Sequence, residues 1–454
     1  MTSTQLNSLS SENLQAIDAS DIATLTTSVV SNISTSQISN LSTAQIQALT
    51  SSELRALSTA QLDKLSTAQF SSMTSAAVAS LTTAQVASFS TTKVQLLDSS
   101  QIKALGATQV GALTSAQLNS LSTTQVQALS AAGVSSISTT ILGQVGTTQV
   151  GALTSSQMKA LTSSQLGTLS ASTASTAFSV LSTSQIASLS SSQTKGLSSA
   201  QVSNLFVAGR ITALAPNALT TLTSAQTSTL TSTQLALLST AQIQGLGTAV
   251  IRSLTTAQLP GITTGQVAAL TQAQAKAISA SQLGDGGLST AQTAALTTYA
   301  IAALDTSALT SLQITSLTTA QAKALNGTQL KTFSSAQIAA LTSTQTQQLT
   351  ANAIKFLTTA QVAALTTTQV SSLTATQLAS LSATQLNAMT STQLPKLTAS
   401  GLRSISLAGM SLSNLTTMLG ATSNSKVISF DQWNILGSSK RAALRVSGFV
   451  PPTT

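Results

Sequence analysis

An apolar residue recurs at every eighth position along most of this chain. From Leu9 the spacing holds to Leu169, and where leucine is absent the position is filled by another apolar residue, such as Ile33 or Phe89. The consensus unit is L-[ST]-[ST]-[AST]-Q-[ILV]-x-[AS], as in LSTAQIQA at 41–48, and we number its positions 1 to 8. A fixed period of this kind indicates an array of repeats.

Four of the eight positions predict a short helix. Ser or Thr at position 2 and Gln at position 5 form a capping box, in which the hydroxyl accepts from a backbone N–H three residues on and the amide reaches back. The apolar residues at positions 1 and 6 form the hydrophobic staple that accompanies this box. At Glu53 the glutamine is replaced by glutamate, the other residue that the box accepts. We therefore expect a cap and one to one and a half helical turns in each unit.

Helices this short must stack, because an isolated helix of fewer than about 12 residues is marginal in water. We predict an all-α solenoid with one short helix per octad, the helices pairing into 16-residue hairpins. The alternative is a β-solenoid, which the strand propensities of Thr and Val favour. Against it, positions 1 and 6 would point to opposite faces of a strand, and no regular Gly, Asn or Asp supplies the bends.

The octad register divides the chain into a long array and a distinct end. The register slips near residues 170–180, 206–213, 283–287 and 313–316. One block between slips runs from Leu288 to Leu312, which predicts that Leu312 lies in the core. We interpret 1–405 as one repeat solenoid with kinks or loops at the slips. Residues 406–454 lose the octad, and we expect them to cap the last core face or to act as a secretion or anchoring segment.

The composition argues against an enzyme. The chain has no His and no Cys, which removes imidazole bases, thiolate nucleophiles and the common zinc ligands. Its nine acidic residues are scattered, except for Glu12, Asp18 and Asp21. The loop Gly-Asp-Gly-Gly at 284–287 offers too few oxygen ligands for calcium. We expect no catalytic, cofactor-binding or metal site, and no cofactor.

The apolar runs are too short for a membrane protein. No run approaches the roughly 18 residues of a membrane-spanning helix, so we expect no transmembrane segment. The first residues, MTSTQLNSLSSENL, lack the basic head and apolar run of a cleavable signal peptide.

Basic residues recur at position 7. The formal net charge is +9. If one repeat position maps onto one face, these residues form a basic stripe that could attract a polysaccharide or lipopolysaccharide. Alternatively, position 7 is simply the solvent-facing position, where Gln47 and Asn119 also occur. No aromatic residues accompany the stripe, so we do not expect nucleic acid as a partner. The stripe comprises Arg55, Lys103, Lys159, Lys195, Arg252, Lys276, Lys323, Lys331, Lys355 and Arg403.

The segments LTTAQVAALT at 357–366 and LSTAQIQALT at 41–50 resemble the Ser/Thr/Ala/Gln-rich repeats of large, adhesin-like bacterial surface and secreted proteins. The resemblance covers nearly all of 1–405. It implies an extracellular or cell-surface location, with export by an uncleaved C-terminal signal in place of a cleavable N-terminal signal peptide. Haem utilisation, a label also given to such proteins, does not carry over, because the chain lacks His and Cys and has only one tyrosine, Tyr299.

These observations predict a non-enzymatic, secreted or cell-surface structural protein. We expect self-association into a homo-oligomer, a fibre, a filament or a matrix layer, since few charges keep copies apart. The alternative is an adhesin or polyanion-binding module that uses the basic stripe. A third hypothesis, binding to ice or crystal surfaces by rows of Thr at positions 2 and 3, competes with the capping role of the position-2 hydroxyl.

Overall fold

The protein is an all-helical solenoid of short helices packed in series. The computed structural model describes residues 1–169, 179–420 and 428–452, and these contain no strand. The predicted α-solenoid is confirmed, and the β-solenoid is wrong for this chain. Within the described ranges, no helix has the length and apolar character needed to cross a membrane.

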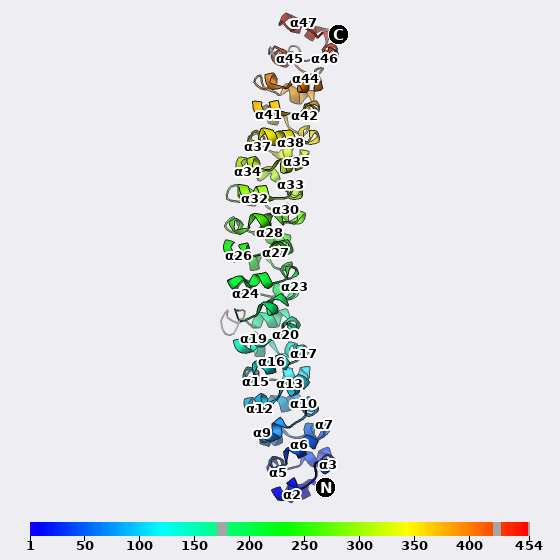
Figure 1. Cartoon of the computed structure of the whole chain (residues 1–454), viewed down its shortest axis with the longest axis vertical. Helices are drawn as coiled ribbons and strands as arrows, with labels where there is room; N and C mark the ends of the chain where they lie inside the picture. The colour runs from blue at the N-terminus through cyan, green and yellow to red at the C-terminus, as the bar shows by residue number, and fades with distance from the viewer. Residues whose placement is uncertain (170–178, 421–427, 453–454) are drawn as a thin grey trace. The chain divides into compact units, whose positions relative to one another are not determined.

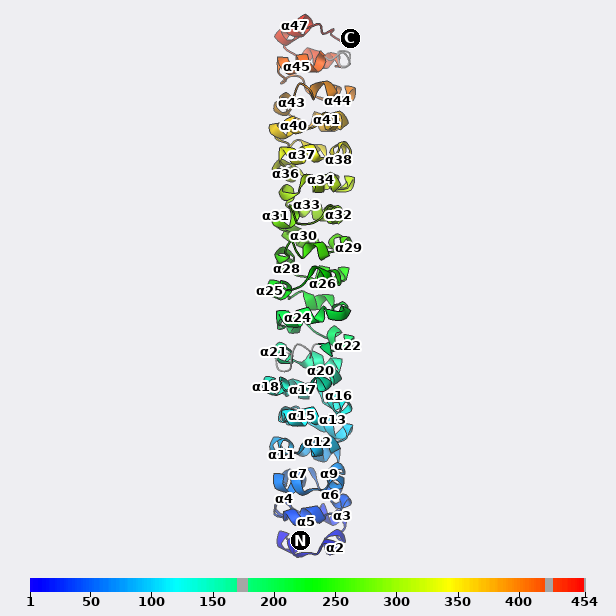
Figure 2. The same cartoon turned by 90° about the vertical axis from the view of Figure 1, so that its left-hand side faces the viewer.

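The chain forms two compact units, Met1–Thr229 and Leu230–Thr454. In each unit the helices stack in chain order (Figure 1, Figure 2). In unit 1 the helices are α1 (Ser3–Ser8), α2 (Ser11–Gln15), α3 (Ala19–Ile22), α4 (Thr27–Ser31), α5 (Thr35–Asn40), α6 (Thr43–Ala48), α7 (Ser51–Ala56), α8 (Thr59–Lys64), α9 (Thr67–Ser71), α10 (Ser75–Ser80), α11 (Thr83–Ala87), α12 (Thr91–Leu96), α13 (Ser99–Ala104), α14 (Ala107–Gly111), α15 (Ser115–Ser120), α16 (Thr123–Ala128), α17 (Ala131–Ser136), α18 (Thr139–Leu142), α19 (Thr147–Ala152), α20 (Ser155–Ala160), α21 (Ser163–Thr168), α22 (Thr183–Ala187), α23 (Ser191–Lys195), α24 (Ser199–Leu205), the 3₁₀ helices η2 (Val207–Ala213) and η3 (Pro216–Leu219), and α25 (Ser224–Thr227).

Unit 2 continues the same pattern. Its helices are α26 (Ser232–Ala236), α27 (Thr240–Gly245), α28 (Thr248–Ser253), η4 (Leu259–Gly261), α29 (Thr264–Ala268), α30 (Gln272–Ala277), α31 (Ala280–Leu283), α32 (Thr290–Ala295), α33 (Thr298–Ala303), η5 (Thr306–Ala308), α34 (Ser311–Ser316), α35 (Thr319–Ala324), α36 (Gly327–Thr332), α37 (Ser335–Ala340), α38 (Ser343–Gln348), α39 (Ala351–Ile354), α40 (Thr359–Ala364), α41 (Thr367–Ser372), α42 (Ala375–Ala379), α43 (Ala383–Asn387), η6 (Leu394–Lys396), α44 (Ala399–Ser404), α45 (Leu412–Leu419), α46 (Phe430–Ile435) and α47 (Ser438–Val446).

Helix α40 shows how one octad folds. The Thr358 hydroxyl accepts from the Gln361 backbone N–H at 3.2 Å, and Gln361 Oε1 accepts from the Thr358 N–H at 2.8 Å. The helix ends at Leu365, whose ψ of 133° is extended. The regular octad is therefore a six-residue helix followed by two extended residues, and the predicted capping box is confirmed in α40 and its sister helices.

The core consists of positions 1 and 6. In α40 the position-6 side chain, Val362, is fully buried, and the position-1 side chain, Leu357, is 4% exposed. Larger residues fit the same positions, as where the rings of Phe70 and Phe89 meet edge to face at 4.9 Å. Each buried Val or Leu side chain contributes about 1.5–3 kcal/mol to stability, which lets helices form that are too short to persist alone.

Stacking joins helices three apart in the regular runs. Helix α35 packs on α38, and α38 packs on α41. The expectation that neighbouring helices pair into 16-residue hairpins is therefore wrong. The two extended residues between helices change the direction of the chain after each helix. A helix therefore packs not on its neighbour in sequence but on the helix about three units later.

The 3₁₀ helices η2 and η5 lie where the octad is irregular, whereas η4 and η6 lie within regular octads that have proline at position 7. Residues 207–213 form η2, and the glycine loop at 284–287 follows α31, with Gly286 at a φ of 77° that favours glycine. The slip placed near 170–180 falls largely on residues 170–178, which lie outside the described part of the chain.

The slip placed at 313–316 is wrong. These residues lie within α34, and Leu312 is 74% exposed. The irregular unit lies earlier, at η5, where the buried Leu309 follows Leu304 by only five positions instead of eight. Leu309, not Leu312, therefore takes position 1.

Residues beyond 405 pack onto the end of unit 2. Helix α45 contacts η6 and α47. The rings of Trp433 and Phe449 stack at 5.3 Å, and Arg445 lies over the Trp433 ring at 5.8 Å. Trp433, Leu444 and Phe449 are buried, so this segment covers core surface.

Candidate functional site

The position-5 glutamines connect successive turns of the stack. While Gln361 Oε1 closes the capping box, its Nε2 donates to the carbonyl oxygens of Leu330 at 2.7 Å and Phe333 at 2.6 Å. An amide has both an acceptor and two donor hydrogens, so one side chain can serve both contacts. Gln361 is only 2% exposed. We call these position-5 glutamines, each donating from Nε2 to carbonyls of the preceding turn, the glutamine ladder.

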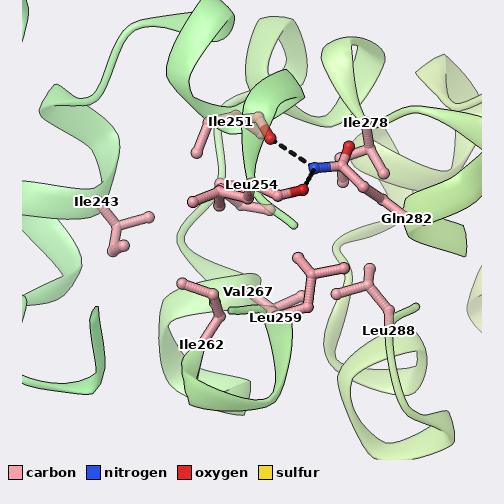
Figure 3. Close-up of a pocket in the computed structure, with 10 residues that line it drawn as sticks. Ile243, Ile251, Leu254, Leu259, Ile262, Val267, Ile278, Gln282 and Leu288 are labelled. Carbon is pink, nitrogen blue, oxygen red and sulfur yellow. Dashed lines mark hydrogen bonds between the residues drawn. The ribbon is translucent and has the colours of Figure 1, made fainter. Parts of the chain in front are cut away.

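The ladder adds a second donor at the ends of the short helices, where the position-6 carbonyl already accepts the backbone N–H of the next position-1 residue, as Ile251 O does from the Leu254 N–H at 3.4 Å. The last carbonyls of any helix lack intrahelical partners, and six-residue helices have a high proportion of such groups. Figure 3 shows Gln282 Nε2 donating to Ile251 O at 2.7 Å and to Leu254 O at 2.8 Å, the position-6 carbonyl and the next position-1 carbonyl. Each ladder glutamine therefore caps the start of its own helix and the end of another.

The ladder sets the pitch of the stack. In regular runs Nε2 reaches carbonyls 31 and 28 residues back, as from Gln61 to Val30 and Ile33. A spacing of 28 residues is three and a half octads, so each turn takes between three and four helices. In irregular regions the spacing changes: Gln185 reaches back 35 and 32 residues, and Gln321 reaches back 28 and 25. Each of these three glutamines contacts the position-6 carbonyl and the next position-1 carbonyl. In Gln101 and Gln165 the position-7 carbonyl replaces that of position 6, while the contact to position 1 is kept.

Two charged residues occupy ladder positions in unit 1. Glu53 is 2% exposed; its Oε2 accepts from the Thr50 N–H at 2.6 Å, as the box requires. Its Oε1 is buried without a hydrogen-bond partner among the described residues. A carboxylate cannot donate where an amide would, so Glu53 keeps the box and loses the link to the preceding turn.

Lys93 fills the same slot with a cation. Its Nζ donates to Leu62 O at 2.7 Å and to Asp63 O, and pairs with the Asp63 carboxylate at 3.4 Å. The Phe70 ring lies 5.7 Å from Nζ. Burial lowers the pKa of Lys93, an effect that the Asp63 carboxylate opposes. Lys93 therefore supplies the donor of the ladder but carries a desolvated charge.

All ten residues of the predicted basic stripe are exposed. A turn takes between three and four helices, so position 7 of successive turns does not return to the same side. The ten stripe residues therefore do not lie on one series of helices that contact each other. Two pairs lie on or directly beside helices that pack together. Arg252 and Lys276 lie on α28 and α30, and Lys331 lies on α36 while Lys355 directly follows α39. Both pairs belong to unit 2.

The charge is divided unequally between the units. Unit 1 has seven Lys and Arg residues against six acids, whereas unit 2 has eleven against three. Near Lys355 the Phe356 side chain is 44% exposed, and its ring lies 5.5 Å from Lys355 Nζ. The excess of positive charge thus lies mainly in unit 2, a division that position-7 counting did not reveal.

The described cavities include a small enclosed pocket and a larger open groove. The apolar pocket of Figure 3, lined by Ile243, Ile251 and Leu259 among others, has a volume of about 20 Å³, room for one water molecule. An open groove of about 330 Å³ lies beside the glycine loop, between Pro260, Thr264 and Gly287. In the part of the chain that is described, no three His, Cys, Asp or Glu residues gather closely enough to hold a metal.

The acidic loop residues are also accounted for locally. Asp285 of the glycine loop is exposed. Asp305 accepts from the Ser307 hydroxyl at 2.7 Å and from its backbone N–H at 3.2 Å. These two hydrogen bonds lower the pKa of Asp305, and they make it the cap of η5.

Comparison with known proteins supports the repeat. Residues 14–51, 50–83, 78–115 and 236–272 match the model of the ALTTAQ repeat. None of the curated proteins matches the chain. A crystal structure of an engineered protein from a structural genomics consortium aligns with 98% of this chain and 96% of its own, at 15% identity and a TM-score of 0.19. With the stacked octads, the ALTTAQ matches identify a helical repeat protein built on an eight-residue unit.

Proposed function

We propose that this chain is a non-enzymatic structural protein that assembles into a fibre, filament or matrix layer outside the cell or on its surface. The observation that carries the proposal is the glutamine ladder. It fixes the register of each turn on the preceding one through buried hydrogen bonds, which cost stability if left unmade. A stack of this kind suits a mechanical or scaffolding role, because the same hydrogen bonds between turns recur along it.

The surface composition supports the same proposal. Only 6% of residues are charged, against about 25% in ordinary domains. Few charges give weak repulsion between copies, and many of the exposed positions hold Ser, Thr or Ala. Close approach of copies is therefore not opposed by the long-range electrostatics that keep most proteins apart.

Electron microscopy of the purified protein in negative stain tests the proposal. We expect filaments or sheets whose abundance grows with protein concentration. Particles that stay monodisperse and separate at every concentration would contradict the structural role. Protection of the chain from protease added to intact producing cells would contradict the surface location.

A polyanion-binding role is the second candidate, and the unequal charge of the units favours it. Two pairs of exposed cations lie on or directly beside contacting helices, both in unit 2, and an acidic polysaccharide could bind the positive charge that they give to this surface. Its test is retention on a heparin column as salt is raised. The double variant Lys331→Gln/Lys355→Gln should elute at lower salt than Lys103→Gln/Lys159→Gln, which loses the same charge from helices that do not pack together. Equal elution of the two variants would count against a site at the paired residues.

A further inference from the structure

In regular units the position-8 side chain lies over position 3 of a helix in the preceding turn. The Ser372 hydroxyl donates to Ser343 O at 3.1 Å, and the Ser72 hydroxyl donates to Thr43 O at 3.5 Å. The residues of each pair are 29 apart in the sequence, and position 8 is Ala or Ser in the consensus. A small side chain at position 8 therefore usually fills the space over position 3.

Phe356 and Gly327 are an exception at these same two positions. Phe356 is the position-8 residue that follows α39, and Gly327 is the position-3 residue that begins α36. A Cβ atom on Gly327 would lie 2.2 Å from Phe356 Cδ2, far closer than two carbon atoms approach in a packed protein. The absence of a side chain on Gly327 therefore makes room for the ring against α36, while Phe356 is still 44% exposed.

Two cations lie beside this ring. Lys355 Nζ is 5.5 Å from the centre of the Phe356 ring. Lys331 follows Gly327 by four residues on α36, and residues four apart in a helix are neighbours on one face. Both lysines are exposed. We call Gly327, Lys331, Lys355 and Phe356 the Phe356 platform.

Acidic residues are scarce around the Phe356 platform. The sequence has no Asp or Glu from 306 to 430. Asp305 lies at the start of η5, which also contacts α36, but its carboxylate already accepts two hydrogen bonds from Ser307. The platform therefore combines a supported, exposed ring with an excess of positive charge.

This combination favours an acidic sugar as the ligand. An aromatic ring can stack on the apolar C–H face of a sugar, and an ammonium group binds carboxylates through charge-assisted hydrogen bonds. A uronic acid offers both the C–H face and the carboxylate on one sugar unit. Single-stranded nucleic acid also uses rings and cations, but it stacks successive bases on several aromatic side chains, whereas the platform has one ring.

We propose that the Phe356 platform binds the uronic-acid units of an acidic polysaccharide. The ring of Phe356 stacks on one sugar, and Lys331 and Lys355 bind the carboxylates of that sugar and the next. The inference rests on the proposed polyanion-binding role and names its ligand. It adds a requirement beyond charge, because a polyanion without sugar rings should use the two lysines and not Phe356.

Two probes with equal numbers of carboxylates test the platform, an oligogalacturonate and a polyacrylate. Phe356→Ser gives the unit its usual position-8 residue and should fold normally by circular dichroism. Its Kd for oligogalacturonate, measured by titration calorimetry at low salt, should rise by about fivefold or more, while its Kd for polyacrylate should be unchanged. Gly327→Ala displaces the ring without removing it and should also weaken only sugar binding. Lys331→Gln/Lys355→Gln should weaken binding of both probes.

Tyr299→Ala is the matched control. It removes a ring that is 76% exposed on α33, and it should bind both probes like the original chain.

Four outcomes would contradict the proposal. If Phe356→Ser binds oligogalacturonate as tightly as the original chain, or loses both probes equally, the platform is wrong and the polyanion-binding role stands. If Phe356→Ser loses affinity for a single-stranded oligonucleotide and not for oligogalacturonate, the ligand is nucleic acid and the proposal is wrong. If the original chain binds neither carboxylate probe at low salt, both the platform and the polyanion-binding role are wrong.

Discussion

Helices α40 and α7 have the same length and the same capping box, but position 5 holds an amide in α40 and a carboxylate in α7. In α40, Gln361 joins its helix to the preceding turn through two short hydrogen bonds. In α7, Glu53 places an oxygen where the amide nitrogen would lie, and that oxygen has no partner among the described residues. By the register of Gln45 and Gln61 on either side, the carbonyls left without a ladder donor are those of Ile22 and Leu25.

The comparison separates two roles that one residue combines. Helix initiation needs only an acceptor at position 5, and both Gln and Glu supply it. Stacking needs a donor, which Gln and Lys supply and Glu does not. The contact between α7 and the preceding turn should therefore be weaker than the contact between α40 and its preceding turn, although both octads fit the same sequence pattern.

Removing the ladder side chain should have the largest effect. In Gln361→Ala the box acceptor and both carbonyl contacts are lost in a buried setting, and we expect about 2–4 kcal/mol of destabilisation. The loss should appear as faster amide hydrogen exchange in α40 and in α36, which supplies Leu330. Gln347→Ala, at an exposed position 7, is the matched control and should change stability by less than about 0.5 kcal/mol. Equal effects of the two substitutions would contradict the ladder.

Exchanging the two residues should change stability in opposite directions. Gln361→Glu keeps the box and loses the donor, and we expect a loss of about 1–3 kcal/mol. Glu53→Gln supplies the missing donor and should stabilise the protein by about 1–2 kcal/mol. Urea unfolding followed by circular dichroism measures both. The ladder would be contradicted if Glu53→Gln were neutral or destabilising.

Lys93→Gln replaces a buried charge by the ladder amide and should stabilise the protein by about 1 kcal/mol near neutral pH. Because burial lowers the pKa of Lys93 from its ordinary value of 10.5, the folded protein binds this proton less tightly than the unfolded chain. In the original protein, stability should therefore gain a contribution as pH rises through the folded pKa towards 10.5. The advantage of the variant, followed by urea unfolding at several pH values, should shrink over that range. A constant difference would show that the lysine charge does not matter.

The smallest expected effect concerns Asp305. Hydrogen bonds from Ser307 lower its pKa, so the stabilisation is present above the ordinary pKa of 3.8 and is lost as pH falls through the folded value. Because the group is exposed, Ser307→Ala should change stability by only a few tenths of a kcal/mol at pH 7. The carboxyl resonance of Asp305 should titrate nearer its ordinary value in the variant. An unchanged titration would show that the Ser307 hydroxyl does not lower this pKa.

The sequence was sufficient to predict the helix in each octad, because the box and the staple act within eight residues. The stacking could not be predicted in the same way, since Nε2 contacts carbonyls 28 and 31 residues away and local pattern does not encode that reach. One signal was available: the box accepts Glu as readily as Gln, yet position 5 holds Glu only at Glu53 among its many glutamines. A preference for the amide over the acid indicates that its donor hydrogens are used.

The candidate surface was predicted in part. Exposure at position 7 follows from the helix, because that residue lies opposite the staple. The arrangement of Arg55, Lys103 and the other cations depends on the number of helices per turn, which the octad alone does not specify. The prediction that Leu312 lies in the core failed for a similar reason. The unit from Leu304 to Ala308 has only five residues, so it shifts the eight-residue register although the helices still stack.

Exchange of the glutamine side-chain amides with D₂O, followed by NMR on protein labelled with ¹⁵N at glutamine Nε2, tests whether these groups hold the turns together. Buried ladder amides such as that of Gln361 should exchange slowly, as a class well separated from exposed amides such as those of Gln5 and Gln347. Glu53→Gln should add one resonance to the slow class. If the side-chain amides at position 5 exchange as fast as those at position 7, the turns are not joined by glutamine.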